Sequence, residues 1–151
     1  CPMKPERTYL LASALTKLQH EHSLRVHVLH VSASRAHNIF EAANVSHLLH
    51  TTSEPDFLRY QQLLAQCDVA LPLITPQDDP KYFSLAHGGK ASGHMAEVIG
   101  HQLPSVMHAD LKQIYAKELR EIALAAPAVS YTNDSSTFEV ALRELLTGLA
   151  C

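Results

Sequence analysis

The chain has 151 residues, 46% of them hydrophobic, which suffices for one domain with a single core that needs no disulfide or metal. Its net charge is −3 and its pI is about 6.4. No block of like charges occurs, so the sequence has no electrostatic footprint for nucleic acid or anionic lipid, and we expect no nucleic-acid partner.

The cysteines and the chain ends do not indicate the cellular compartment of the protein. Cys1 and Cys151 are terminal, and the three cysteines give neither metal-ligand spacing nor a disulfide framework. Cys67 is expected to be a small buried hydrophobe. No apolar stretch approaches the ~18 residues of a membrane span, and no signal peptide is present, so localisation and membrane association stay open. The missing initiator Met and the abrupt ends predict an excised domain.

Helices and strands are expected to alternate along the whole chain. Apolar residues at helical spacing predict helices over 5–21, 32–43, 54–66, from 91 or 92 onward, 111–123 and 136–149. Ser53 is the expected N-cap of the third helix. Apolar and β-branched runs predict strands over 24–31, 45–50, 68–74, 103–108 and 128–131. This order predicts an open, mostly parallel sheet with helices on both faces, a Rossmann-like α/β fold in a single domain over 1–151.

The stretch 67–104 is the expected ligand site. An apolar strand, a polar loop and a new helix follow one another there, and open α/β sheets bind ligands at the carboxyl ends of their strands. Glycines allow a tight turn close to a ligand, and the first amides of a helix favour a diphosphate. The candidate donor-binding residues are Gly88, Gly89, Lys90, Ser92, Gly93 and His94. The alternative is an ordinary loop before a helix.

Arg35 and a regular series of histidines are the other residues with possible binding chemistry. Arg35 follows the first predicted strand and is a candidate for phosphate or sugar contact; the alternative is a simply exposed side chain. Four of the 11 histidines, His87, His94, His101 and His108, recur every seven residues. They run through a loop, a helix and a strand, and so do not converge as zinc ligands would. We therefore expect no metal site.

One order of motifs resembles a known family. CDVALPLI is followed by a loop, by EVIGHQLP from Glu97 to Pro104, and by YTND and STFEVALRELL near the end. This order is similar to the carboxy-terminal nucleotide-sugar-binding domain of GT-B glycosyltransferases. It looks most like the family-four retaining type, whose motif is a Glu, seven residues, and a second Glu in EAxAxGxP.

The resemblance implies roles for particular positions. Glu97 matches the second Glu, which in the family contacts the donor's ribose. The family's usual Gly falls at Gln102, and the first Glu of the motif falls at Gly89. That carboxylate is therefore missing, which leaves the catalytic residues unknown and Lys90 as the charged neighbour.

The implied function is half of an active site. The resemblance predicts a domain that binds a nucleoside-diphosphate sugar as substrate, without a cofactor, beside an amino-terminal acceptor domain of the same parent chain. The isolated fragment is expected to be inactive. The alternative is a non-enzymatic nucleotide- or protein-binding module, a degenerate transferase domain. The nucleobase, the sugar, the acceptor, the stereochemical outcome and the oligomeric state are left open.

Overall fold

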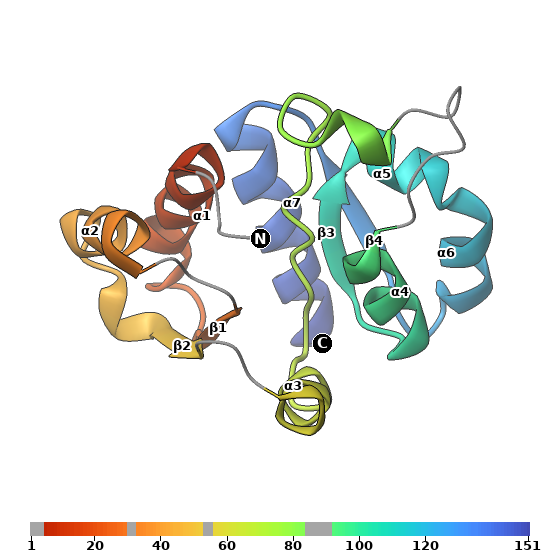
Figure 1. Cartoon of the computed structure of the whole chain (residues 1–151), viewed down its shortest axis with the longest axis horizontal. Coiled ribbons are helices and arrows are strands. Elements are labelled where there is room, and N and C mark those ends of the chain that lie inside the picture. The colour runs from red at the N-terminus through yellow and green to blue at the C-terminus, as the bar shows by residue number, and fades with distance from the viewer. Residues whose placement is uncertain (1–4, 30–32, 53–55, 84–91) are drawn as a thin grey trace. The chain divides into compact units, whose positions relative to one another are not determined.

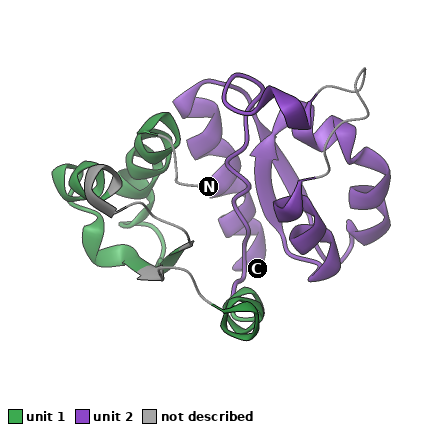
Figure 2. Ribbon diagram, viewed as in Figure 1, with its two compact units in different colours: residues 1–66 green, residues 67–151 purple. Residues whose placement is uncertain are grey.

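The chain forms two compact units, residues 1–66 and residues 67–151, which are coloured separately in Figure 2. The computed structural model describes residues 5–29, 33–52, 56–83 and 92–151. Each unit contains a small parallel sheet accompanied by helices. The expected mixed α/β class is thereby confirmed, whereas the single domain over 1–151 stays a prediction.

Unit 1 pairs two short strands and packs two helices against each other. Its elements are α1 (Pro5–Leu18), β1 (Val26–Leu29), α2 (Ala33–Ala42), the 3-10 helix η1 (Ser46–Leu48), β2 (Leu49–Thr52) and α3 (Phe57–Leu64). β1 and β2 are parallel, with Val26 opposite Leu49. α1 packs on α2. Its inner face is apolar and carries Leu11, Leu15 and Leu18, all buried, at the expected three- to four-residue spacing.

Two predictions in unit 1 need correction. The strand predicted over 45–50 begins only at Leu49, because the preceding residues Ser46–Leu48 form a 3-10 turn. α3 begins at Phe57, and its N-cap is Asp56, whose side chain accepts a hydrogen bond from Arg59 N at 2.8 Å. The predicted cap Ser53 lies outside the described residues.

Unit 2 is built around a second parallel pair. Its elements are the 3-10 helix η2 (Pro80–Tyr82), α4 (Gly93–Gly100), β3 (Ser105–His108), α5 (Ala109–Ile114), α6 (Ala116–Ile122), β4 (Ala128–Tyr131) and α7 (Ser135–Leu149). β3 and β4 are parallel, and His108 lies opposite Tyr131. Asp134 caps α7 by accepting the Ser136 amide at 2.8 Å, as the polar turn before this helix predicts.

The segment 68–74 contributes less to the sheet than its sequence predicts. It joins β3 through a single parallel bridge at Ala70, which donates to Pro104 O at 2.8 Å and accepts from Val106 N at 3.1 Å. Pro72 follows two residues later and has no N–H to continue the ladder. Ile74 N instead donates locally to Pro72 O. The described strands thus form two separate pairs, and an open Rossmann-like sheet is not shown.

β3 is covered on both faces, and this fixes the helices around it. All four of its residues are buried. Met107 belongs to an apolar cluster with α4 and α6 residues such as Met95 and Leu119. Tyr131, the register partner of His108, packs edge-to-face on Phe138 of α7. Figure 1 shows α7 on one side of this sheet and α4 and α6 on the other. Helices therefore cover both faces of this small parallel sheet.

Within the described residues, no helix combines the length and the apolar character needed to cross a membrane.

α4 ends in a left-handed residue that is not glycine. Gln102 has φ 50°, and the bonds Leu103 N to Val98 O (3.0 Å) and Gln102 N to Ile99 O (3.2 Å) form a Schellman motif. Asn44 adopts the same left-handed conformation after α2, with φ 57°. Asparagine tolerates this conformation better than glutamine does, so strain is concentrated at Gln102.

Replacement of Gln102 by Gly should therefore stabilise the protein, by about 0.5–1 kcal/mol, because the relieved strain exceeds the extra entropy of the unfolded chain. Chemical denaturation of the wild type and of Gln102→Gly measures the change. Asn44→Gly is the matched control and should change the free energy of unfolding less. A Gln102→Gly protein less stable than the wild type would contradict the assigned backbone conformation.

Candidate functional site

The amino-terminal end of α4 lies at the carboxyl edge of the β3–β4 pair. α4 leads through a short connection into the start of β3, and Figure 1 shows the two elements running in opposite directions. Met95 and Val98 bury one face of α4 in the core of unit 2. The helix begins at Gly93, close to the predicted opening at residue 91 or 92. Its first N–H groups, which have no acceptor within the helix, point towards that edge.

A tyrosine outside α4 holds the start of this helix. The helix predicted over 111–123 is in fact two helices, α5 and α6, which meet at Tyr115, where φ is −100° and ψ is 21°. The Tyr115 hydroxyl accepts a hydrogen bond from Ser92 N at 3.0 Å. Because Tyr115 also packs against the core cluster of unit 2, the chain entering α4 is tied to that core.

The Ser92 hydroxyl is buried without a hydrogen-bond partner. Ser92 is 2% exposed, and its Oγ has no hydrogen-bond partner among the residues that the structure describes. It occupies the N-cap position of α4, yet its side chain makes no capping bond. Buried hydroxyls normally have a partner, because leaving one unpaired costs about 1–3 kcal/mol. Ser92 therefore retains both a donor and an acceptor at the helix start.

Glu97 and His94 lie near each other on α4. His94 Nδ1 is 3.7 Å from Glu97 Oε2, and the two form an ion pair only when the imidazole is protonated. The Glu97 side chain is 27% exposed and that of His94 is 61% exposed. The His94 side chain is thus exposed, and that of Glu97 is partly exposed, on the helix whose start is the candidate site.

The structure describes only some of the other predicted site residues. Gly93 is the first residue of α4, and a Cβ built there would meet nothing within 4 Å, so packing does not require glycine at this position. Gly88, Gly89 and Lys90 lie outside the described residues. Arg35 belongs to α2 in unit 1, and its side chain is outside the described part of the structure. The structure therefore brings together Ser92, Gly93, His94 and Glu97.

Sequence reasoning missed a buried histidine at the same edge. His108 ends β3 and is 4% exposed. Its Nδ1 accepts from Asp110 N at 3.2 Å, so the neutral ring carries its proton on Nε2, which donates to Asn133 Oδ1 at 3.0 Å. The ring also packs edge-to-face on Tyr131, at 5.7 Å between centroids. His108 thus caps α5 and ties the ends of β3 and β4 together. In the sequence, His108 was distinguished only as the last of four histidines that recur every seven residues.

Two ionisable groups in unit 2 have shifted pKa values for local reasons. The hydrogen bonds from Ser136 lower the pKa of Asp134, so this cap of α7 persists to a lower pH than it would with an unperturbed aspartate. Burial, and then the neighbouring Asp68, raises the pKa of the Cys67 thiol. Cys67 is only half-buried, which makes it more exposed than the sequence predicts.

Among the residues that the structure describes, no three His, Cys, Asp or Glu side chains gather as metal ligands would. Comparisons with protein-family models, with curated proteins and with solved structures give no significant match for this chain. The resemblance to GT-B donor domains therefore stays a prediction.

Replacing Ser92 with Ala separates a capping role from a ligand-binding role. Because Oγ makes no bond, its removal should leave stability unchanged or raise it by up to about 1 kcal/mol, whereas loss of a working N-cap costs about 0.5–2 kcal/mol. Ser105, at the opposite end of β3, also buries a hydroxyl without a partner. Ser105→Ala is therefore the matched control, and urea unfolding of both variants gives the comparison. A loss above 1 kcal/mol in Ser92→Ala alone would show that the hydroxyl caps α4.

Proposed function

We propose that this chain is the nucleotide-sugar donor-binding domain of a GT-B glycosyltransferase, with an open Rossmann-like sheet and its ligand at the start of α4. The observation that carries the proposal is the buried, unpartnered Ser92 hydroxyl at a helix N-terminus on the carboxyl edge of a parallel sheet. Helix N-termini at this edge are where α/β folds bind phosphate groups.

The backbone at the end of α4 supports the same proposal. The motif EAxAxGxP has its glycine at the position of Gln102, and Gln102 is the residue with a positive φ. A glycine is favoured at such a position because it has no Cβ. At position 102 the backbone thus has the left-handed conformation that the family's glycine would favour, although the residue is glutamine.

The proposed division of labour follows the order of groups along α4. The diphosphate accepts hydrogen bonds from the first amides of the helix and from the Ser92 hydroxyl. Lys90, which lies outside the described residues, supplies a positive charge. Glu97 lies one turn further on and accepts hydrogen bonds from the ribose hydroxyls. Stabilisation of the departing diphosphate by the helix dipole is this domain's share of catalysis. The acceptor side of the reaction belongs to another domain of the parent chain, so this fragment binds the donor without turning it over.

Calorimetric titration of a panel of nucleoside diphosphates against the 151-residue chain tests the proposal. At least one ribonucleoside diphosphate should bind. Glu97→Gln should weaken that binding about tenfold or more, because a charge-assisted hydrogen bond contributes about 1.5–3 kcal/mol. The same substitution should weaken binding of the 2′-deoxy analogue less, since that analogue lacks one of the ribose hydroxyls that Glu97 contacts.

Glu118→Gln is the matched control, because Glu118 is an exposed acid in the first turn of α6. It should leave both affinities unchanged. The proposal fails if no nucleotide binds at millimolar concentration. If nucleotides bind but Glu97→Gln and Glu118→Gln behave alike, the ribose assignment alone is wrong.

A further inference from the structure

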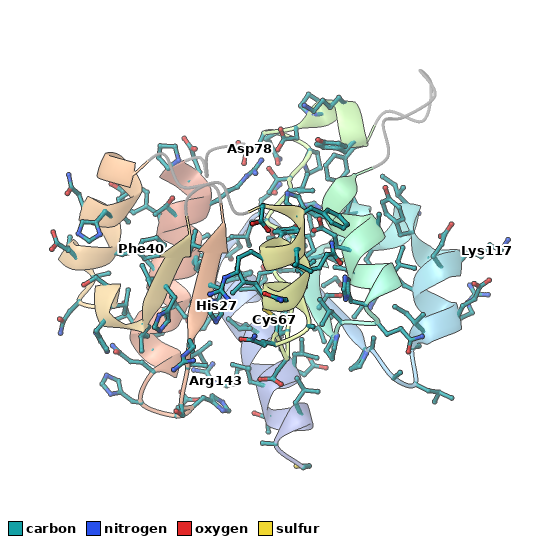
Figure 3. All side chains as sticks on the ribbon, turned by 60° about the horizontal axis from the view of Figure 1, so that its bottom comes forward. His27, Phe40, Cys67, Asp78, Lys117 and Arg143 are labelled. Atoms are coloured by element: carbon teal, nitrogen blue, oxygen red, sulfur yellow. The ribbon has the colours of Figure 1, made fainter. Side chains whose placement is uncertain are left out.

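Two histidines lie side by side on the β1–β2 pair of unit 1. His27 and His50 are register partners, and their ring centroids are 5.5 Å apart with an interplanar angle of 31°. Register partners on parallel strands present their side chains on the same face. His50 is exposed and His27, labelled in Figure 3, is partly exposed. The pair is therefore within reach of a ligand in solution.

Two arginines add to this pair. Arg25 precedes β1 and is two residues from His27, and Arg59 lies in α3. After burial and His50, the charges of these two arginines are the further causes that lower the pKa of His27. We call Arg25, His27, His50 and Arg59 the basic cluster. Its members come from three parts of unit 1 that are separate in the sequence. Folding alone brings them together.

The basic cluster has no internal counter-charge. In the described part of the chain, no carboxylate forms an ion pair with any of its four members. Partial burial, and then His50, Arg25 and Arg59, lower the pKa of His27. Like charges at directly opposed strand positions are unfavourable. This arrangement therefore disfavours the protonated form of His27 unless an anion is present.

The charges decide which ligand fits. Two imidazoles at this separation resemble part of a metal site, but the positive charges of Arg25 and Arg59, which act on His27, disfavour a cation. Guanidinium groups instead match phosphate oxygens, to which they donate two hydrogen bonds at once. Protonated imidazoles donate to the same oxygens. All four members of the cluster thus favour an anion.

We propose that the basic cluster is a binding site for a phosphate-type oxyanion, such as a phosphate monoester. The site is distinct from the start of α4 and does not depend on the donor-binding proposal. Arg25 precedes β1, Arg59 lies on α3, and His27 and His50 occupy the second of the four register positions of β1 and β2, away from the carboxyl ends of these strands. The phosphate group comes from a soluble molecule or from a lipid headgroup.

Binding at this site should strengthen as the pH falls. A bound phosphate favours the protonated imidazoles, so binding takes up protons. Without phosphate, the lowered pKa of His27 means that the unfolded chain binds protons more readily than the folded one. Unit 1 should then lose stability as the pH falls below the ordinary histidine value of 6.5. Phosphate should oppose this loss.

The test is titration of the whole chain with inorganic phosphate, followed through the imidazole proton resonances at pH 6 and pH 8. The resonances of His27 and His50 should shift together, with tighter binding at pH 6. Arg59→Gln and His50→Gln should each weaken the affinity about threefold or more, within the range of exposed charge contacts. Arg120→Gln and His47→Gln are matched controls, because both residues are exposed and lie outside the cluster; neither should change the affinity.

A second arm separates the two sources of phosphate. The chain is centrifuged with vesicles that contain phosphatidic acid, and with neutral vesicles as control. Pelleting that Arg59→Gln abolishes assigns a lipid headgroup, whereas phosphate binding without pelleting assigns a soluble ligand. The proposal is overturned if phosphate shifts neither imidazole, or if the cluster variants and the controls bind it equally well.

Discussion

The double-sided burial of β3 is the constraint on which the arrangement of unit 2 depends. Val106 and Met107 are both fully buried, the one alternating with the other across the strand. Met107 holds α4 and α6 through Met95, Val98 and Leu119. α7 packs on the β3–β4 pair as well. Because α4 is fixed in this way and runs back to the start of β3, its first residues must lie at the carboxyl edge of the sheet.

That edge is held together by polar contacts as well as by packing. Tyr115 binds the amide of Ser92, and His108 joins the residues after β3 to Asn133 after β4. These bonds connect loops that apolar packing alone would leave less precisely placed. Among the described residues, they leave the Ser92 hydroxyl without a hydrogen bond and Glu97 with only His94 of its own helix as an ion-pair partner. The edge thus combines a rigid frame with polar groups that a ligand can use, which is the arrangement a binding site requires.

The sequence predicted most elements of this fold, because periodicity and turn residues are local signals. α1, α4, β3, β4 and α7 follow from apolar spacing and from caps such as Asp134. The break at Tyr115 was not predictable, since Tyr115 suits the inner face of one continuous helix, and its hydrogen bond from Ser92 N joins residues that are distant in the sequence. The apolar run around Pro72 predicted a full strand, although proline has no N–H to donate to a neighbouring strand.

The candidate site was predictable only in part. The position of the α4 start and of Glu97 came from motif order, whereas the His108 network and the basic cluster depend on contacts between distant segments. Arg25, His27, His50 and Arg59 form no charge block along the chain. Composition and net charge describe the linear sequence and do not report how charged side chains gather on the folded surface.

The central claim is that a nucleoside diphosphate binds at the start of α4. Amide nitrogen–proton spectra, recorded while the bound nucleotide is titrated in, test it residue by residue. The account predicts that the signals of Ser92, Gly93, His94 and Glu97 shift most, with smaller changes at His108 across the edge. Shifts centred at the opposite end of the sheet, around Ser105 and Ala128, would contradict it.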